Sequence, residues 1–240
     1  MGITGLNETI KKTPFIFFVS FVFFWFPVSA QTYGELSEQA LQYIEKDSLE
    51  QAETVFRQAL AMEPANPHNT LIFSNIGTLQ RQMQRLDEAA ESYTYALNLA
   101  PYSILVLLNR AAVYMEQGFS NRAYVDYCIV LDKDKKNTEA LLMRAYIYMI
   151  RRDYNAARMD YNCLLEVDTL HYSARLGLAT LNQREEKFRE AMNILEELIA
   201  EYPIEMELYV ARAEVEQNMN LPDLAIMDID RAIQLNPLSA

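Results

Sequence analysis

Two cysteines and two histidines are the side chains of this 240-residue chain with the widest choice of chemistry. Cys128 and Cys163 lie far apart in the sequence, whereas zinc ligands usually come in pairs a few residues apart, and no histidine accompanies them. We expect both cysteines to be separate thiols in or near the core. His68 and His171 each lie between expected helices, where a histidine is more often a solvated loop residue than a general base.

The glycines do not indicate catalysis either. They are scattered singly along the chain, so they form no glycine-rich loop that could hold a phosphate group. The serine elbow of hydrolases is also missing from the sequence. These observations predict that the protein is not an enzyme and that it uses no metal or cofactor.

Three arginines carry a different kind of chemistry, because each is followed at the same interval by an aspartate. The pairs are Arg110 with Asp126, Arg144 with Asp160, and Arg212 with Asp228. A cation that recurs only together with an anion predicts a charged hydrogen-bonded pair between two facing helices. We expect these pairs to be structural, since partly buried ion pairs fix the register of a fold more than they add stability.

The elements that must position these residues repeat along the chain. Windows of thirty-four residues from Tyr33, with Pro67 to Asn69 inserted after the first, give six copies: 33–66, 70–103, 104–137, 138–171, 172–205 and 206–239. The eighth place of every window is small, and the twentieth place is always alanine. The twenty-fourth place is always large, and it holds Phe56, Tyr93, Tyr127, Tyr161, Leu195 and Ile229.

This pattern predicts two antiparallel helices in each window. The small residues allow two helix backbones to approach closely, and the large residue fills the space between neighbouring windows. Four windows close with a proline, which ends the second helix: Pro64, Pro101, Pro203 and Pro237. The sequence from Tyr33 to about Ser239 thus resembles the tetratricopeptide repeat family. The resemblance implies an all-α fold, a right-handed superhelical solenoid of stacked helix-turn-helix repeats, in one array over residues 31–240.

In that family a concave groove, lined mainly by the first helix of each repeat, usually holds a peptide or a helix of a partner protein. Nine residues at groove places of the third to fifth repeats form an apolar stretch: Leu105, Leu108, Ala112, Met115, Leu142, Tyr146, Met149, Ile150 and Leu176. We expect Tyr146 to be the main anchor for a partner. The alternative is that these residues are ordinary core between helices. A clamp for a C-terminal carboxylate is rejected, because Ser37, Leu41 and Glu139 stand where it needs Lys or Asn.

The first thirty residues have the layout of a secretory signal peptide. Lys11 and Lys12 precede an apolar run over 14–28, and small residues at Ser29 and Ala30 come before Gln31. We expect cleavage after Ala30, with an uncleaved membrane anchor as the alternative. The array would then be exported, to the periplasm of a bacterial cell envelope or beyond it.

Charge and the C-terminal helix bear on the choice of partner. A formal net charge of −12 disfavours nucleic acid and the membrane surface, which both require basic residues. Apolar residues over Leu224 to Leu235, with no polar helix after Pro237, predict a face that docks on a second copy or a partner. We therefore expect a non-catalytic adaptor that holds a protein or peptide ligand, or alternatively an architectural subunit that self-associates end to end.

Overall fold

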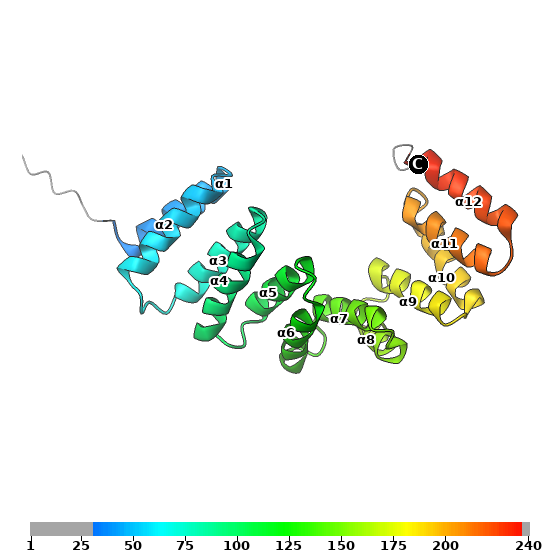
Figure 1. Ribbon diagram of the computed structural model, residues 1–240, viewed down its shortest axis with the longest axis horizontal. Helices are drawn as coiled ribbons and strands as arrows, with labels where there is room; N and C mark the ends of the chain where they lie inside the picture. Colours follow the sequence, from blue (N-terminus) through cyan, green and yellow to red (C-terminus); the bar gives the residue numbers. More distant parts are fainter. Residues whose placement is uncertain (1–30, 237–240) are drawn as a thin grey trace, which may run out of the picture. The chain divides into compact units, whose positions relative to one another are not determined.

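The computed structural model describes residues 31–236, and all regular secondary structure in that range is α-helical (Figure 1). The expected signal peptide at 1–30 and the closing Pro237 lie outside the described residues. Twelve helices follow one another: α1 (Tyr33–Glu45), α2 (Leu49–Met62), α3 (Asn69–Gln82), α4 (Leu86–Leu99), α5 (Ile104–Glu116), α6 (Ser120–Lys133), α7 (Thr138–Ile150), α8 (Tyr154–Val167), α9 (Tyr172–Arg184), α10 (Phe188–Glu201), α11 (Met206–Asn218) and α12 (Pro222–Leu235).

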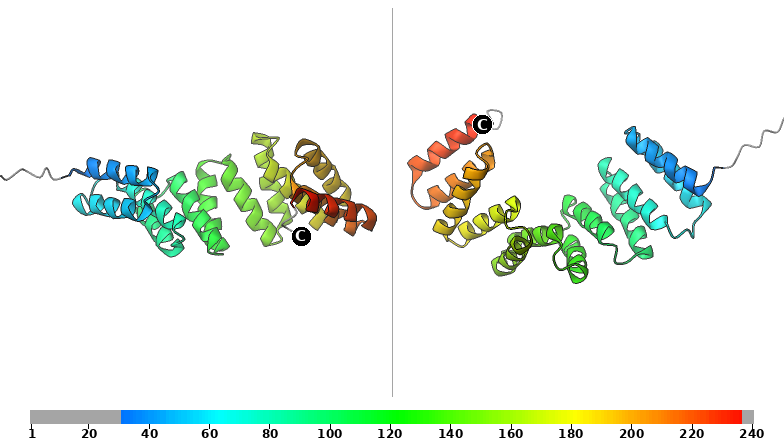
Figure 2. Two further views of the ribbon diagram at one scale, coloured as in Figure 1. Left: turned by 90° about the horizontal axis from the view of Figure 1, so that it is seen from above. Right: turned by 180° about the vertical axis from the view of Figure 1, so that it is seen from behind.

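The helices form six pairs, which confirms the predicted all-α solenoid of stacked helical hairpins. Each odd-numbered helix packs on the even-numbered helix that follows it, and each even-numbered helix packs on the next pair. The pairs follow one another in chain order in every view (Figure 2). First helices also contact each other directly, α3 with α5 and α7 with α9. None of the helices between residues 31 and 236 is both long and apolar enough to cross a membrane.

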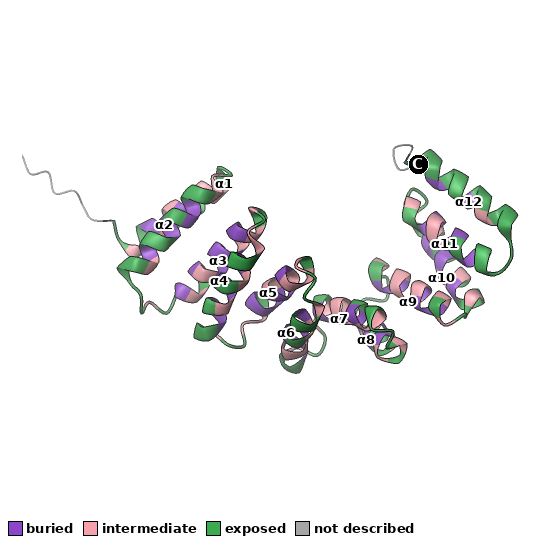
Figure 3. Ribbon diagram, viewed as in Figure 1, coloured by how far each residue is buried: buried purple, intermediate pink, exposed green. Residues whose placement is uncertain are grey.

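The small and large residues of the repeat lie where the helices meet. In the first five pairs the alanine at the twentieth place is completely buried, and the large residue at the twenty-fourth place is at most 4% exposed. The last pair differs, because Ile229 in α12 is 40% exposed whereas its counterpart Leu195 in α10 is 1% exposed. Most residues of α12 are exposed, as Figure 3 shows in green. No helix of the described chain follows α12 to cover them.

Every hairpin turn uses the same backbone device. The second residue after the end of each first helix adopts a positive φ of 55° to 77°: Asp47, Gln84, Gly118, Arg152, Glu186 and Asn220. The next N–H then donates to a carbonyl five residues back, as in Phe119 to Tyr114, 2.7 Å. This is the Schellman ending of a helix, in which glycine is the preferred residue. Only one of the six turns has that glycine. The left-handed conformation is least favourable for the long side chains at Gln84, Arg152 and Glu186, whereas Asp47 and Asn220 tolerate it better.

Side-chain caps fix several helix starts. Thr32 and Glu35 form a reciprocal capping box at α1. Asn137 caps α7, and Asp153 caps α8. His171, which we expected to be a solvated loop residue, is half-buried and caps α9: its Nδ1 accepts from the N–H of Ala174 at 3.4 Å. A cap explains this histidine without any catalytic role.

Candidate functional site

An apolar cavity of about 410 Å³ opens between the first helices of the fourth, fifth and sixth repeats. Its walls come from α7 and α9, its floor includes one residue of α8, and one residue of α11 stands at its edge. The lining residues are Leu142, Met143, Tyr146, Met149, Tyr161, Tyr172, Ser173, Leu176, Gly177, Thr180 and Glu207. We call this feature the α7–α9 cavity. A cavity of this size with apolar walls and a few polar groups is typical of a binding site.

Four of the nine residues assigned to the groove come together around this cavity: Leu142, Tyr146, Met149 and Leu176. Tyr146 is 51% exposed, so its ring is available to a partner. Met149 and Leu142 are partly buried against the core, and they therefore both line the cavity and support the packing beneath it.

The other five assigned residues do not line the α7–α9 cavity. Leu105 and Ile150 are exposed away from it, and Ala112 and Met115 are half-buried. The assignment of Leu108 to the groove is wrong, because this side chain is only 9% exposed and belongs to the hydrophobic core. The sequence pattern does not distinguish a groove place from a core place on a helix that is apolar on nearly all sides.

The floor of the cavity depends on a close contact between α8 and α9. Tyr161 packs against Gly177 so tightly that a Cβ atom at position 177 would lie 2.4 Å from its Cζ. Glycine is required there by space, and its missing side chain leaves room above the tyrosine ring. Burial raises the pKa of Tyr161 to about 12, so its phenol stays protonated at neutral pH.

The edge of the cavity is polar and acidic. The hydroxyl of Tyr172 in α9 donates a hydrogen bond to the Glu207 carboxylate in α11. Burial, followed by this hydrogen bond, raises the pKa of Tyr172. The Tyr172 ring also packs edge-on against Tyr202, with centroids 5.1 Å apart. These contacts hold Glu207 beside the opening.

The three arginine and aspartate pairs lie within hairpins, on facing helices. Arg144 donates from Nε and Nη2 to the two carboxylate oxygens of Asp160, at 2.8 and 2.7 Å. The same two-bond geometry joins Arg110 to Asp126 and Arg212 to Asp228. All three aspartates are buried. The hydrogen bond to Asp160 raises the pKa of Arg144, which stays charged. The pairs connect the two helices of each of these hairpins.

Both cysteines are free and half-buried. Cys128 accepts a weak contact from Arg144 Nη1 at 3.8 Å, whereas Cys163 lies 4.0 Å from the Lys135 carbonyl oxygen. Over residues 31–236, no group of three or more Cys, His, Asp or Glu side chains is placed to hold a metal ion.

A buried polar network between the first two repeats has no recognisable pattern in the sequence. Glu53 of α2 accepts hydrogen bonds from Arg57 and from Gln80 of α3, and it also pairs with Arg85 in the following turn. Gln80 in turn accepts from Ser92 of α4 at 2.7 Å. Polar contacts join the same two places at other interfaces, Tyr124 with Tyr148 and Arg158 with Asn182, but the residue types differ. The repeat periodicity therefore does not identify these particular partners.

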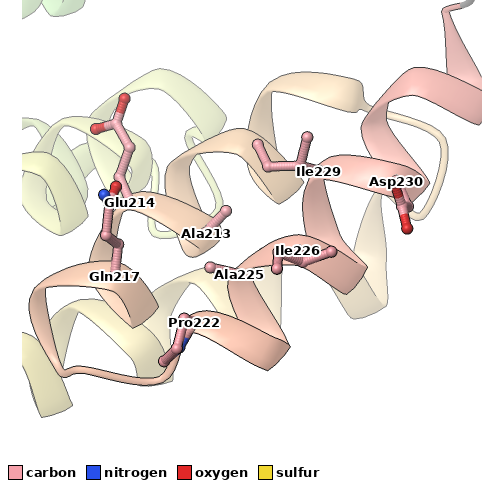
Figure 4. Close-up of a pocket in the computed structure, with 8 residues that line it drawn as sticks. All are labelled: Ala213, Glu214, Gln217, Pro222, Ala225, Ile226, Ile229 and Asp230. Atoms are coloured by element: carbon pink, nitrogen blue, oxygen red, sulfur yellow. The ribbon is translucent and has the colours of Figure 1, made fainter.

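A second apolar hollow, of about 320 Å³, lies on the outer side of the last pair (Figure 4). Its lining comes from α11 and α12: Ala213, Glu214, Gln217, Pro222, Ala225, Ile226, Ile229 and Asp230. The residues that correspond to Ala225 and Ile229 in the preceding pair are Ala191 and Leu195, which are buried in a core with α11. We call this surface the α12 face.

Comparisons with known proteins agree with this architecture. A family model described as tetratricopeptide repeat matches residues 38–104. A tetratricopeptide repeat protein from Parabacteroides merdae ATCC 43184 has a crystal structure that is 35% identical, covering 85% of this chain and 80% of that one, with a TM-score of 0.80. A search of curated proteins found no match.

Two more distant structures share the fold alone. PilW, described as a widely conserved type IV pilus biogenesis factor, is 15% identical over 88% of this chain and 96% of its own, with a TM-score of 0.70. YrrB, described as a TPR protein with an unusual peptide-binding site, is 16% identical over 76% of this chain and 93% of its own, with a TM-score of 0.62.

Proposed function

The chain belongs to the tetratricopeptide repeat family, and from that premise we propose that it is a non-catalytic adaptor that binds a partner protein or peptide in the α7–α9 cavity. Tetratricopeptide repeat folds are generally scaffolds for protein interaction, and one structural neighbour, YrrB, is described by its peptide-binding site. The ligand is a segment of another protein.

The observation that carries this proposal is the exposure of apolar side chains around a preformed cavity. The Tyr146 ring is half-exposed beside Leu142 and Leu176, on helices that have already buried another face in the core. An apolar concave surface with aromatic and methionine side chains is favourable for an apolar partner segment, because these side chains adapt their packing and lose little entropy.

The proposed place of action is the bacterial cell envelope, in the periplasm or outside the cell. The basic and apolar pattern of residues 1–30 supports export. N-terminal sequencing of the protein from an envelope fraction checks this, and the expected first residue is Gln31. A protein that retains Met1 in the membrane fraction would instead indicate an uncleaved anchor.

Site-specific photo-crosslinking tests the adaptor function. A benzophenone amino acid replaces Tyr146 in the full chain, and the protein is irradiated in envelope extract. The matched control places the same group at Met159 in α8, an exposed apolar position outside the cavity, 72% exposed. We expect a discrete crosslinked partner from position 146 only. Equal crosslinking from both positions, or none from position 146, would contradict the proposal.

The α12 face favours a second candidate function, an architectural subunit that associates with another copy of itself. Leu224, Ile226, Met227, Ile229 and Ile233 are all exposed on this helix. Sedimentation velocity at increasing concentration measures such association, which Ile226→Glu should abolish and Met159→Glu should leave unchanged. A wild-type protein that stays monomeric at high concentration would remove this candidate.

A further inference from the structure

The hydroxyl group of Tyr161 has no hydrogen-bond partner within residues 31–236. The side chain is only 4% exposed, and it lines the α7–α9 cavity. Its Oη would lie 2.7 Å from a Cβ atom on Gly177, which lines the same cavity. The free donor is therefore at the floor of a space that a ligand can enter, where it can donate a hydrogen bond to that ligand.

The corresponding tyrosines of the two preceding repeats have hydroxyl groups in different environments. The Tyr93 hydroxyl hydrogen-bonds to that of Thr78 at 2.9 Å. The Tyr127 hydroxyl is completely buried without a partner, and Tyr127 does not line the α7–α9 cavity. Of these three tyrosines, Tyr161 is the one that combines a free hydroxyl with a place in the lining of the α7–α9 cavity.

The walls favour an aromatic ring over an aliphatic side chain. Tyr146, Tyr161 and Tyr172 bring three rings to one cavity, and Met143 and Met149 add two thioethers. Rings bind other rings edge-on or offset, and methionine sulfur makes favourable contacts with ring edges. A ring that also carries a hydroxyl oxygen would accept the hydrogen bond that Tyr161 offers.

The negative charge of Glu207 at the edge of the cavity favours a ligand with a basic residue next to the inserted ring. Glu207 forms no ion pair with any residue that the structure describes, and its hydrogen bond from Tyr172 leaves acceptor positions open. No lysine or arginine lines the cavity, and the chain as a whole is acidic, with a net charge of −12. A lysine or arginine beside the inserted ring would complement this edge.

We infer that the α7–α9 cavity receives a tyrosine side chain of a partner peptide, in which a lysine or arginine lies close to that tyrosine. This inference rests on the proposed adaptor function. Tyr161 donates a hydrogen bond to the hydroxyl of the inserted tyrosine, and Glu207 pairs with the neighbouring cation.

The experiment selects ligands for the full chain from a phage-displayed library of random twelve-residue peptides. We expect the enriched peptides to share a tyrosine with a lysine or arginine nearby. For a synthetic peptide from this set, Tyr161→Phe should weaken binding about tenfold, because the buried hydroxyl pair is lost. Replacing the peptide tyrosine with phenylalanine should cause a similar loss, and the two changes together should cost little more than either alone. Glu207→Gln should weaken binding about fivefold and reduce its salt dependence.

Tyr127→Phe is the matched control, because it removes the same hydroxyl one repeat earlier, away from the cavity. Binding should not change in that variant. Enriched peptides that lack an aromatic residue or a cation, or that bind the Tyr161→Phe variant equally well, overturn the inference. If those peptides still lose binding on Tyr146→Glu, the adaptor function stands and only the tyrosine specificity fails. If no peptide is enriched, or none depends on Tyr146, both proposals fail.

Discussion

The ring of Tyr161 in α8 rests on the backbone of Gly177 in α9, where an added Cβ atom would lie 2.4 Å from Cζ and 2.7 Å from Oη. No carbon atom fits at that distance, so the glycine sets how closely the fourth and fifth repeats approach. The same contact forms the floor of the α7–α9 cavity. Packing between repeats and the shape of the candidate site therefore depend on one pair of residues.

Gly177→Ala should destabilise the protein by about 1–3 kcal/mol, because the new methyl group must displace a buried ring. Urea unfolding followed by circular dichroism measures the change. Gly34→Ala is the control, since a Cβ atom there meets only Thr32 Oγ1 at 4.0 Å. That variant should be neutral or slightly more stable. Equal stability of both variants would show that α8 and α9 can shift freely.

Asp160→Ala should destabilise by about 3–5 kcal/mol, because Arg144 loses both of its hydrogen bonds to a carboxylate in a partly buried position. The double variant Arg144→Met with Asp160→Leu should recover most of that loss, since it leaves no unpaired charge. Chemical denaturation of the single and double variants gives the comparison. Asp132→Ala is the control, because Asp132 pairs with Lys133 on the surface, and its loss should cost under about 1 kcal/mol. A small effect of Asp160→Ala would mean that the pair is solvated.

Gln84→Gly should stabilise the protein by about 1 kcal/mol. Gln84 has a φ of 60°, which is unfavourable for a residue with a Cβ atom and costs glycine nothing. The same substitution at exposed Gln58, inside α2, should destabilise by about 1 kcal/mol. Thermal melts of the two variants should therefore shift in opposite directions. A shift in the same direction would show that the turn is not strained.

Glu216→Gln should stabilise the protein at pH 7 by about 1 kcal/mol. Glu216 is 4% exposed and its Oε2 has no hydrogen-bond partner in the described structure. Burial and the nearby Asp228 raise its pKa, so the folded state prefers the protonated acid. Its contribution to stability is therefore complete at low pH and is lost as the pH rises through the folded-state pKa. The variant should lose this dependence and match the wild type near pH 3.

Glu53→Gln should change the stability at pH 7 in the opposite direction to Glu216→Gln. Burial alone would raise the pKa of Glu53, but hydrogen bonds from Arg57 and Arg85, together with one from Gln80, hold it below its usual value. Its contribution is present above the unfolded-state pKa and is lost as the pH falls through the folded-state pKa. The variant should be less stable than the wild type at pH 7 and similar to it at low pH. Denaturation curves at several pH values give the free energy of unfolding of each variant. If this free energy depended on pH in the same way in both variants, these assignments would be contradicted.

The sequence by itself determined the number, the order and the pairing of the helices. Alanine at every twentieth place and a large residue at every twenty-fourth are local, repeated signals, and the helices they predict follow from spacing along one chain segment. The pairing of Arg144 with Asp160 also belongs to this level, because both residues lie within one hairpin. The exported location stays a prediction, since residues 1–30 lie outside the described structure.

Only the tertiary structure decided which side chains meet between repeats. Leu108 and Tyr146 occupy places that the pattern treats alike, yet one is buried and the other is half-exposed. The contact of Tyr161 with Gly177 occurs at one repeat interface, and the residues that take the places of Glu53 and Gln80 differ from one interface to the next. Such contacts depend on the distance and angle between neighbouring helices, which all the packed side chains set together. The periodicity of the sequence predicts the features that all repeats share. The candidate binding site instead depends on contacts that are specific to one interface.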